Sequence, residues 1–430
     1  VGTSEPAIRL LLSILLGYPL AFIHRYTLYA KSGLSQHLYF LITGLSIGYF
    51  NYGLEVLHIV VAVLYTYAVT KLLRYSALSV TIVFIANMGH LLMGYYYTGT
   101  DNYDIKWTMP QCVLVLRLIG YAFDLYDGTL PDDKLSKDNK KICIKQAPGF
   151  LEYCGFMFFP ASCLVGPQFP LKRYQNFVAG NYRDSPGCII PGLKRLSLGI
   201  MYLTIFQVGC MFFTEPYMLS EDFNGRSLVV KCFYLGLWAK FHLYKYISCW
   251  LITEGALITF GISHNGKDSG GRTQWNGCEN VRLWVFETTT EFSHYIQSFN
   301  INTNQWVGHY VYKRLRFLGN RYLSQFLALM FLAVWHGFHS GYYVCFAFEF
   351  LVVFFEKEFK AMVNSNARLS ELFEQPGVRQ ARFVVLRLYT FVFMGWCLLP
   401  FVMLKLAKYW HMFSTVYFMG FIVFLPWPLL

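Results

Sequence analysis

The sequence predicts an all-α polytopic membrane protein, with about 11 transmembrane helices and with re-entrant or broken helices around a central chamber. Its composition is 55% hydrophobic and only 14% charged, whereas a soluble protein cannot bury so large an apolar fraction. The apolar residues form runs of about 20 residues, which is the length that crosses a bilayer. Lys and Arg gather between these runs, as expected for loops on the cytoplasmic side. We therefore predict a single membrane domain over residues 1–430.

Apolar runs mark the expected helices in order along the chain. They fall near residues 6–24, 37–53, 54–72, 78–97, 110–126, 150–166, 192–214, 227–247, 249–262, 322–336, 338–356, 383–405 and 411–428. Several runs are too short to cross a membrane alone. Two adjacent pairs, 227–247 with 249–262 and 322–336 with 338–356, are expected to be broken or re-entrant elements beside a cavity.

Four polar segments separate these runs: 127–148, 172–195, 263–321 and 357–382. If they share the cytoplasmic face, the spans between them come in even numbers or include re-entrant pieces. A membrane transporter is the competing class, because transporters also carry charges inside the membrane. We find no internal repeat in the sequence, which argues against an inverted-repeat transporter.

The placement of the +12 net charge and of the 11 cysteines argues against two other classes, nucleic-acid-binding proteins and disulfide-rich proteins. The basic residues lie in loops beside anionic headgroups and are not interleaved with stacking aromatics on a soluble face, so we expect no nucleic-acid partner. The cysteines form no CxxC pair and lie mostly in apolar segments, which argues against a disulfide framework. Because the chain starts at Val1 and stops in an apolar segment, we expect both termini to be trimmed.

His336 is the first candidate functional residue, because it places an imidazole inside an apolar stretch. An ionisable side chain at membrane depth is costly and indicates a functional site. If the stretch is one helix, Leu329, Leu332, His336, His339 and Tyr343 share one inward face. A neutral imidazole there can act as a general base. The alternative is a histidine that is hydrogen-bonded for structural reasons alone.

A metal site is the second alternative for the histidine pair. His336 and His339 could share a metal with a carboxylate such as Glu254 or Glu349. Histidine-rich sites normally show three protein ligands, and the sequence places no third ligand near the pair. We therefore predict no metal. Glu254 has two interpretations: an ion pair with Lys240 or Lys245, or a place in the chamber wall.

Asn300 is the second catalytic candidate, within the amide-rich segment 299–306. Its amide could orient a substrate or stabilise developing negative charge. The alternative is a turn or capping residue, since Asn is common at such positions. Only the fold could bring Asn300 to His336.

Several motifs together resemble the membrane-bound O-acyltransferase family, most closely its lysophospholipid acyltransferases of the lysophosphatidylcholine type. The residues that carry this resemblance are 250–256 (WLITEGA), Phe299-Asn300 with Trp306, 310–315 (YVYKRL), Trp335-His336-Gly337, Gly341-Tyr342-Tyr343, Gly166-Pro167 and Pro400-Phe401. Phe299 stands where many members have Trp. The resemblance covers nearly the whole chain.

The resemblance implies transfer of a fatty acyl group from acyl-CoA to the free sn-2 hydroxyl of a lysophospholipid, with lysophosphatidylcholine as the expected acceptor. His336 matches the family's catalytic histidine and Asn300 its catalytic asparagine. It further implies a multi-pass protein of the endoplasmic reticulum membrane, with acyl-CoA as co-substrate and no bound cofactor. Acyl transfer to a protein, sterol or diacylglycerol is the alternative, and the oligomeric state is left open.

Side chains near the two catalytic candidates are the expected binding residues. We expect the coenzyme phosphates to meet Lys313, Arg314 and Arg316, which follow the Asn300 segment closely. Aromatic faces suit a choline headgroup. The candidates for substrate binding are therefore Trp306, Trp335, Tyr342 and Tyr343, together with the acidic Glu254.

Overall fold

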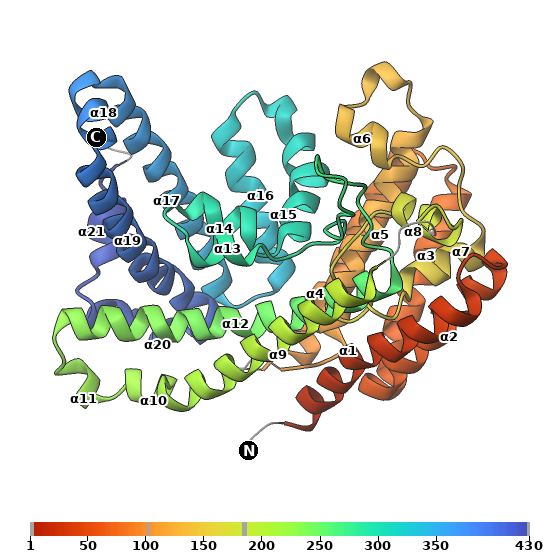
Figure 1. Cartoon of the computed structure of the whole chain (residues 1–430), viewed down its shortest axis with the longest axis horizontal. Helices are drawn as coiled ribbons and strands as arrows, with labels where there is room; N and C mark the ends of the chain where they lie inside the picture. Colours follow the sequence, from red (N-terminus) through yellow and green to blue (C-terminus); the bar gives the residue numbers. More distant parts are fainter. Residues whose placement is uncertain (1–3, 101–103, 183–186, 428–430) are drawn as a thin grey trace. The chain divides into compact units, whose positions relative to one another are not determined.

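The computed structural model describes residues 4–100, 104–182 and 187–427 (Figure 1). This part of the chain consists of helices and irregular segments, with two isolated β-bridges. The all-α prediction is therefore confirmed. The expectation about trimmed ends falls on residues outside the described part of the chain.

The helices form two compact units. The first comprises Val1–Met201, Ser248–Asn280 and Gln305–Val311, and the second comprises Tyr202–Ile247, Val281–Asn304 and Tyr312–Leu430. The division falls inside four helices, each of which contributes residues to both units: α9 (Ile189–Phe212), α12 (Leu228–Phe260), α15 (Ile301–Val307) and the π-helix η4 (Gly308–Tyr312).

The remaining helices of the first unit come from the N-terminal part of the chain. They are α1 (Glu5–Ile23), η1 (His24–Leu28), α2 (Gly33–Tyr52), η2 (Gly53–Glu55), α3 (Val56–Leu72), α4 (Ala77–Thr98), α5 (Thr108–Thr129), η3 (Asp132–Lys134), α6 (Lys137–Ile142), α7 (Phe150–Met157) and α8 (Leu171–Val178). Helix α5 is the most deeply buried of the long apolar helices.

Arg117 of α5 explains why the helix predicted over 150–166 ends early, at Met157. Its guanidinium donates hydrogen bonds to the carbonyl oxygens of Phe156 (3.0 Å) and Met157 (3.1 Å) and to Oγ of Ser162 (2.9 Å). These bonds satisfy backbone groups that helix continuation would otherwise use, and Pro160 lacks the amide to continue it. The prediction of a full-length helix here was wrong.

The remaining helices of the second unit come from the C-terminal part of the chain. They are α10 (Glu215–Met218), α11 (Glu221–Asn224), α13 (Leu283–Glu287), α14 (Phe292–Ser298), η5 (Lys313–Leu318), α16 (Arg321–His336), α17 (Ser340–Ser365), α18 (Ala367–Glu374), α19 (Pro376–Met403), α20 (Leu406–Thr415) and α21 (Met419–Phe424). The expected last span over 411–428 is replaced by the short helices α20 and α21.

One of the two predicted helix breaks exists and the other does not. Helix α12 runs through 33 residues without interruption, because no proline stops it between its ends. The predicted break between 247 and 249 was therefore wrong. The break between α16 and α17 is confirmed: α16 ends at His336, and Gly337 has a φ of 121°.

Six helices among the described residues are long and apolar enough to cross a membrane. They are Glu5–Leu28, Gly33–Leu72, Ala77–Thr98, Thr108–Thr129, Ile189–Phe212 and Pro376–Met403. Helices α12 and α17 exceed the necessary length but carry charged residues such as Lys240 and Glu349, which lower their mean hydropathy. The polytopic prediction is confirmed, whereas the larger number of about 11 crossings stays a prediction.

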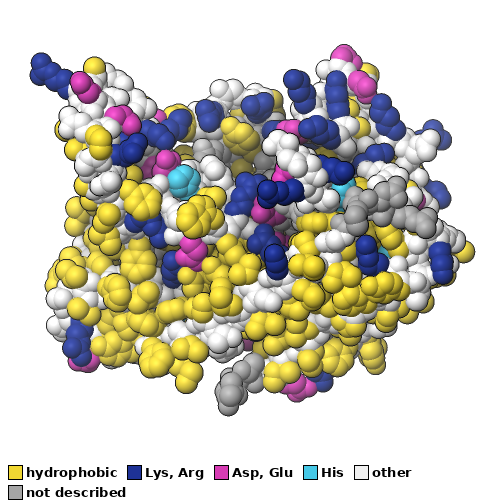
Figure 2. All heavy atoms as spheres, viewed as in Figure 1, with side chains coloured by type: hydrophobic (Ala, Val, Ile, Leu, Met, Phe, Trp, Pro, Cys, Tyr) yellow, Lys and Arg dark blue, Asp and Glu magenta, His cyan; other side chains and the backbone are white. Residues whose placement is uncertain are grey.

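The surface of each unit fits a membrane environment. Figure 2 shows hydrophobic side chains spread over α1 and α9, and over α12 and α20, while Lys and Arg gather over α6 and over α18. Large apolar side chains are exposed on these helices; Val229 of α12, for example, is 79% exposed. Apolar surface of this extent is expected where lipid is the solvent.

Candidate active site

His336 is held at the C-terminal end of α16 by the helix break that follows it. The amide of Gly337 donates to the carbonyl oxygens of Ala333 (3.3 Å) and Val334 (3.1 Å), which closes the helix. The φ of 121° at Gly337 lies in a region that favours glycine over residues with a side chain. The chain therefore turns away directly after the imidazole.

Four aromatic rings surround the His336 imidazole. The ring centroids of Trp335, Tyr342, Phe346 and Phe401 lie 4.7, 5.3, 5.5 and 5.1 Å from that of His336. The first belongs to α16, the next two to α17 and the last to α19. This environment disfavours a charged imidazolium and keeps the ring as a neutral proton acceptor.

The ring nitrogens of His336 make no hydrogen bond to any other described residue, although the side chain is only half-buried. A histidine retained for structure is normally hydrogen-bonded when it is buried. His336 is only half-buried, so its general-base role stays a prediction. A nitrogen without a partner among the described residues is available to a substrate.

A close contact between α17 and α19 builds this aromatic cage. A Cβ atom at Gly341 would lie 1.9 Å from the carbonyl oxygen of Pro400, so only glycine allows the two backbones to approach. The contact sets Tyr342 and Phe401 beside each other, with 5.1 Å between their ring centroids. Both rings thereby reach His336.

The single helical face predicted for His336, His339 and Tyr343 does not exist. His339 is the N-cap of α17 rather than a continuation of α16, because the chain breaks at Gly337. Tyr342, not Tyr343, contacts the His336 ring. In the described part of the chain, no cluster of three His, Cys, Asp or Glu side chains is arranged to hold a metal.

Asn300 lies at the start of α15 with a φ of 50°, in the left-handed region that Asn tolerates better than most residues. Its carbonyl oxygen accepts a bond from the amide of Asn304 (3.1 Å). The Asn304 side chain in turn donates to the carbonyl oxygens of Ile296 (2.9 Å) and Phe299 (3.0 Å). The turn that presents Asn300 is thus fixed by Asn304, four residues further along the chain.

Phe299 anchors the other side of this turn. It forms a β-bridge with Val281, and its ring stacks on Phe286 with 5.9 Å between centroids. The amide of Arg282 also donates to the carbonyl oxygen of Ser298 (2.9 Å). Asn300 and His336 both belong to the second compact unit.

The predicted binding residues divide between the two units. Trp335, Tyr342, Tyr343, Lys313, Arg314 and Arg316 belong to the second unit, whereas Trp306 and Glu254 belong to the first. The three cations lie on η5, where Arg316 is exposed and the other two are half-buried. Tyr342 and Trp335 contact the His336 ring, and Tyr343 is half-buried.

Trp306 and Glu254 are engaged by neighbouring elements of the first unit. The indole of Trp306 donates to the carbonyl oxygen of Leu116 on α5 at 2.7 Å. Glu254 pairs with Nε of Arg195 at 3.0 Å and accepts from the amide of Asn280 at 2.7 Å. The expected pairing of Glu254 with Lys240 or Lys245 is wrong, because all three lie on the continuous helix α12, where about 13 Å or more of helix separates Glu254 from either lysine.

The sequence did not point to Phe346 as part of the site. Its ring reaches His336 from α17 and Phe401 reaches it from α19. A phenylalanine in a chain with 40 of them carries no signal by itself. Only its spacing of four residues from Tyr342, one helical turn, could have linked it to the same face.

A bundle of long apolar helices that holds an unpartnered imidazole among aromatic rings defines an integral membrane protein with a candidate acid–base site. The chain belongs to the membrane-bound O-acyltransferase family, whose sequence profile matches residues 92–399. This confirms the resemblance noted in the sequence.

Named relatives match almost the entire chain. It is 44% identical over 432 residues to lysophospholipid acyltransferase 5 of Drosophila melanogaster, covering 99% of this chain and 87% of that protein. The human protein of the same name is 43% identical over 429 residues, covering 99% and 88%. That of Caenorhabditis elegans is 36% identical over 436 residues, covering 100% and 92%.

Proposed function

We propose that this protein transfers a fatty acyl group from acyl-CoA to the free sn-2 hydroxyl of a lysophospholipid, with lysophosphatidylcholine as the acceptor. The family membership and the names of the relatives support this activity. The observation that carries it is the half-buried His336 imidazole, whose nitrogens have no partner among the described residues. Such a group is ready to accept a proton from a bound hydroxyl.

In the proposed reaction the acceptor hydroxyl oxygen attacks the thioester carbonyl carbon, while a ring nitrogen of His336 takes the hydroxyl proton. The carbonyl oxygen becomes an oxyanion, which the Asn300 amide stabilises or orients. The C–S bond then breaks, and the departing coenzyme A thiolate takes the proton from His336. The thioester is already activated, so holding the two substrates together and excluding water supply much of the acceleration.

We assign the coenzyme phosphates to Lys313, Arg314 and Arg316 on η5, because phosphates favour charge-assisted bonds to such side chains. Trp335, Tyr342 and Tyr343 stay proposed substrate contacts, and the contact of Tyr342 with the His336 ring supports its role. The hydrogen bonds of Trp306 and Glu254 favour positioning roles for these two residues.

We further propose that residues 1–430 act as one catalytic domain in the endoplasmic reticulum membrane. The family profile spans residues of both compact units, which supports a single functional domain. The multi-pass membrane character rests on the family and on the six apolar helices among the described residues.

The test of the proposed activity is an acceptor panel with purified, reconstituted protein and labelled acyl-CoA. The panel contains lysophosphatidylcholine, other lysophospholipids, diacylglycerol, a sterol and a peptide. We expect ester formation on lysophospholipids, fastest on lysophosphatidylcholine. Transfer only to a sterol, diacylglycerol or peptide would replace the proposed acceptor with one of the alternatives.

A further inference from the structure

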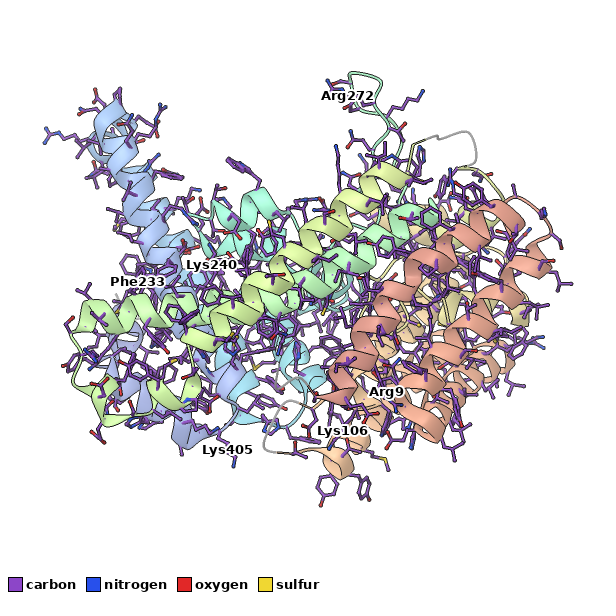
Figure 3. The ribbon with its side chains drawn as sticks, turned by 60° about the horizontal axis from the view of Figure 1, so that its bottom comes forward. Arg9, Lys106, Phe233, Lys240, Arg272 and Lys405 are labelled. Carbon is purple, nitrogen blue, oxygen red and sulfur yellow. The ribbon has the colours of Figure 1, made fainter. Side chains whose placement is uncertain are left out.

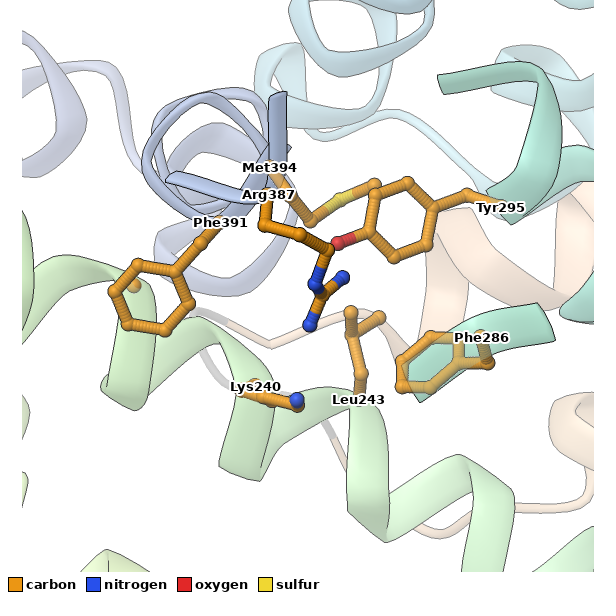
Figure 4. Close-up of a pocket in the computed structure, with 8 residues that line it drawn as sticks. Lys240, Leu243, Phe286, Tyr295, Arg387, Phe391 and Met394 are labelled. Carbon is orange, nitrogen blue, oxygen red and sulfur yellow. The ribbon is translucent and has the colours of Figure 1, made fainter. Parts of the chain in front are cut away.

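A pocket in the second unit lies among side chains of α12, α13, α14 and α19 and encloses about 300 Å³ of open space (Figure 4). Its polar lining consists of Lys240, Tyr295 and Arg387, and its apolar lining includes Phe286 and Phe391. Figure 4 shows the guanidinium of Arg387 directed into this space, toward Lys240. The lining thus presents two cationic side chains and no carboxylate.

Arg387 is the unusual member of this set, because it lies within α19, a helix apolar enough to cross a membrane. One of its nitrogens donates to the carbonyl oxygen of Thr289 at 2.6 Å. None of the ion pairs among the described residues includes Arg387. An arginine inside a membrane helix is costly unless a partner compensates its charge. A guanidinium carries several further N–H donors, and these can meet an anion.

Lys240 does not add to this uncompensated charge. Its ammonium pairs with Oε2 of Glu287 at 2.6 Å. The other oxygen of this carboxylate, Oε1, accepts hydrogen bonds from Tyr202 (3.0 Å) and Tyr244 (2.9 Å). Glu287 is therefore engaged away from Arg387. The pocket carries about one net positive charge, which suits a singly charged anion such as a phosphodiester.

The pocket is far from the His336 cage along α19. Arg387 and Phe401, whose ring contacts His336, are 14 residues apart (401 minus 387) on this continuous helix, which is about 21 Å. The phosphate and the free hydroxyl of one lysophospholipid are separated by only a few bonds. An acceptor with its hydroxyl at His336 therefore cannot have its phosphate here, and an anion in the pocket belongs to a second molecule.

This distance fits the headgroup layer of a membrane. The hydrocarbon core of a bilayer is about 30 Å thick, so a group about 21 Å along the helix from an imidazole near the bilayer centre lies at the level of the lipid phosphates. Helix α19 begins within the polar segment 357–382, which we expect on the cytoplasmic side. We therefore expect the pocket at the cytoplasmic leaflet.

The surroundings of the pocket favour a lipid as the source of the anion. Phe233 lies two helical turns before Lys240 on the same face of α12 and is 59% exposed; Figure 3 labels both residues on this helix. The Phe233 ring contacts Phe391 of the pocket, with 6.1 Å between centroids. On α19, Leu388 is 58% exposed. A headgroup at Arg387 would thus have apolar helix surface beside it for its acyl chains.

The pocket also adjoins the turn that presents Asn300. The pocket residue Phe286 stacks on Phe299, which directly precedes Asn300. Tyr295, a second lining residue, contacts the Phe286 ring with 5.5 Å between centroids. A ligand that holds these two rings in place would therefore also steady the Asn300 turn.

We propose that this pocket binds an anionic membrane phospholipid that is not a substrate. Its phosphate contacts the guanidinium of Arg387 beside the Lys240 ammonium, and its acyl chains lie along the exposed faces of α12 and α19. The lipid remains bound while the acceptor occupies the His336 cage, because the two places share no contact residue. Only the effect of this lipid on the Asn300 turn rests on the proposed function.

The experiment measures equilibrium binding of radiolabelled dioleoyl phosphatidylglycerol to the full-length protein in micelles of a neutral detergent, without acyl-CoA. We expect unlabelled phosphatidylglycerol to displace the label about 3- to 10-fold better than phosphatidylcholine with the same acyl chains, because the pocket carries a net positive charge. Dioleoylglycerol, which lacks the phosphate, should compete about 10- to 100-fold less well than phosphatidylglycerol.

Three variants test the contact itself. Arg387→Gln should weaken binding of phosphatidylglycerol about 10- to 100-fold, because it removes a charged hydrogen-bond partner. Arg387→Lys keeps the charge and should retain part of the affinity. Arg379→Gln removes an exposed arginine from the same helix and should leave the affinity unchanged. Thermal unfolding shows whether each variant is folded, and the competition series on the parent protein tests the proposal without any variant.

Four results would overturn the assignment. The first is equal affinity of the parent and Arg387→Gln proteins for phosphatidylglycerol. The second is an equal loss in Arg379→Gln, which would indicate general attraction of anions instead of a site. The third is displacement by phosphatidylcholine or dioleoylglycerol as strong as that by phosphatidylglycerol. The fourth is equally strong displacement by inorganic phosphate or coenzyme A, which would identify a site for a soluble phosphate or for the coenzyme.

Because this experiment measures binding without acyl transfer, a failure of the proposed reaction in the acceptor panel would be seen separately.

Discussion

Asn300 combines an amide side chain with a left-handed backbone, and either property explains why Asn stands there. We predict that Asn300→Gly, which accepts the φ of 50° and lacks the amide, lowers kcat about 10²- to 10³-fold. Its thermal stability should stay close to that of the parent protein. Asn300→Ala should lose the same activity and also about 1 kcal/mol of stability, because it lacks this backbone tolerance. A Gly variant with full activity would assign Asn300 a purely backbone role.

The sequence predicts His336 as a functional residue because an imidazole within an apolar run is itself the signal. It does not predict the cage, because Tyr342, Phe346 and Phe401 reach the ring from α17 and α19. The prediction that His336, His339 and Tyr343 share one helical face is wrong, because the helix breaks at Gly337. A glycine within an apolar run can be either a tolerated helix residue or a break, and the sequence alone does not distinguish them.

At the scale of the elements, the close approach of α17 and α19 is the contact on which the His336 cage depends. We predict that Gly341→Ala costs about 1–3 kcal/mol in stability, because its Cβ would collide with the carbonyl oxygen of Pro400. Activity should fall with it, since Tyr342 and Phe401 flank this contact. Thermal unfolding and turnover in detergent measure both effects.

The control for this substitution is Gly377→Ala near the start of α19. A Cβ there meets no other atom within 4 Å, so stability and turnover should be unchanged or slightly improved. Equal behaviour of the two alanine variants would contradict the role of the α17–α19 contact.

The short helix η5 supports a second prediction at this scale. Arg316→Gln should raise the KM for acyl-CoA about 3- to 10-fold, because an exposed cation that meets a phosphate contributes modestly. The KM for lysophosphatidylcholine and kcat should not change. Arg368→Gln, which removes an exposed arginine from α18, is the control. An unchanged KM for acyl-CoA in the Arg316 variant would remove this residue from the coenzyme site.

The sequence predicts long uninterrupted helices better than short ones. It places both ends of α4 and α5, and the C-terminal end of α19, to within three residues of the predicted apolar runs, whereas α19 begins at Pro376 instead of 383. It fails at α7, whose end depends on Arg117 satisfying carbonyl groups from another element. It also fails at α12, where the two adjacent apolar runs 227–247 and 249–262 predict a break but one helix of 33 residues runs through both.

At the scale of the whole molecule, composition and charge placement predict a multi-pass membrane protein, and the family membership agrees. The division into two compact units is not readable from the sequence, because it falls inside continuous helices and joins segments that are far apart along the chain. The sequence also does not predict that Lys240, Tyr295 and Arg387 line one pocket, because these residues belong to α12, α14 and α19. Its signal was an arginine within the apolar run 383–405, whose neighbours come from α12, α13 and α14.

The most direct test of the account is the rate of acyl transfer from acyl-CoA to lysophosphatidylcholine by His336→Ala, beside His339→Ala as a neighbouring-histidine control. Both variants should insert in the membrane and unfold at the same temperature as the parent protein. We predict that His336→Ala loses about 10²- to 10⁴-fold in kcat, as expected for a general base, while His339→Ala keeps most of its turnover. Turnover by His336→Ala equal to that of the parent protein would contradict the assignment of this imidazole as the proton acceptor.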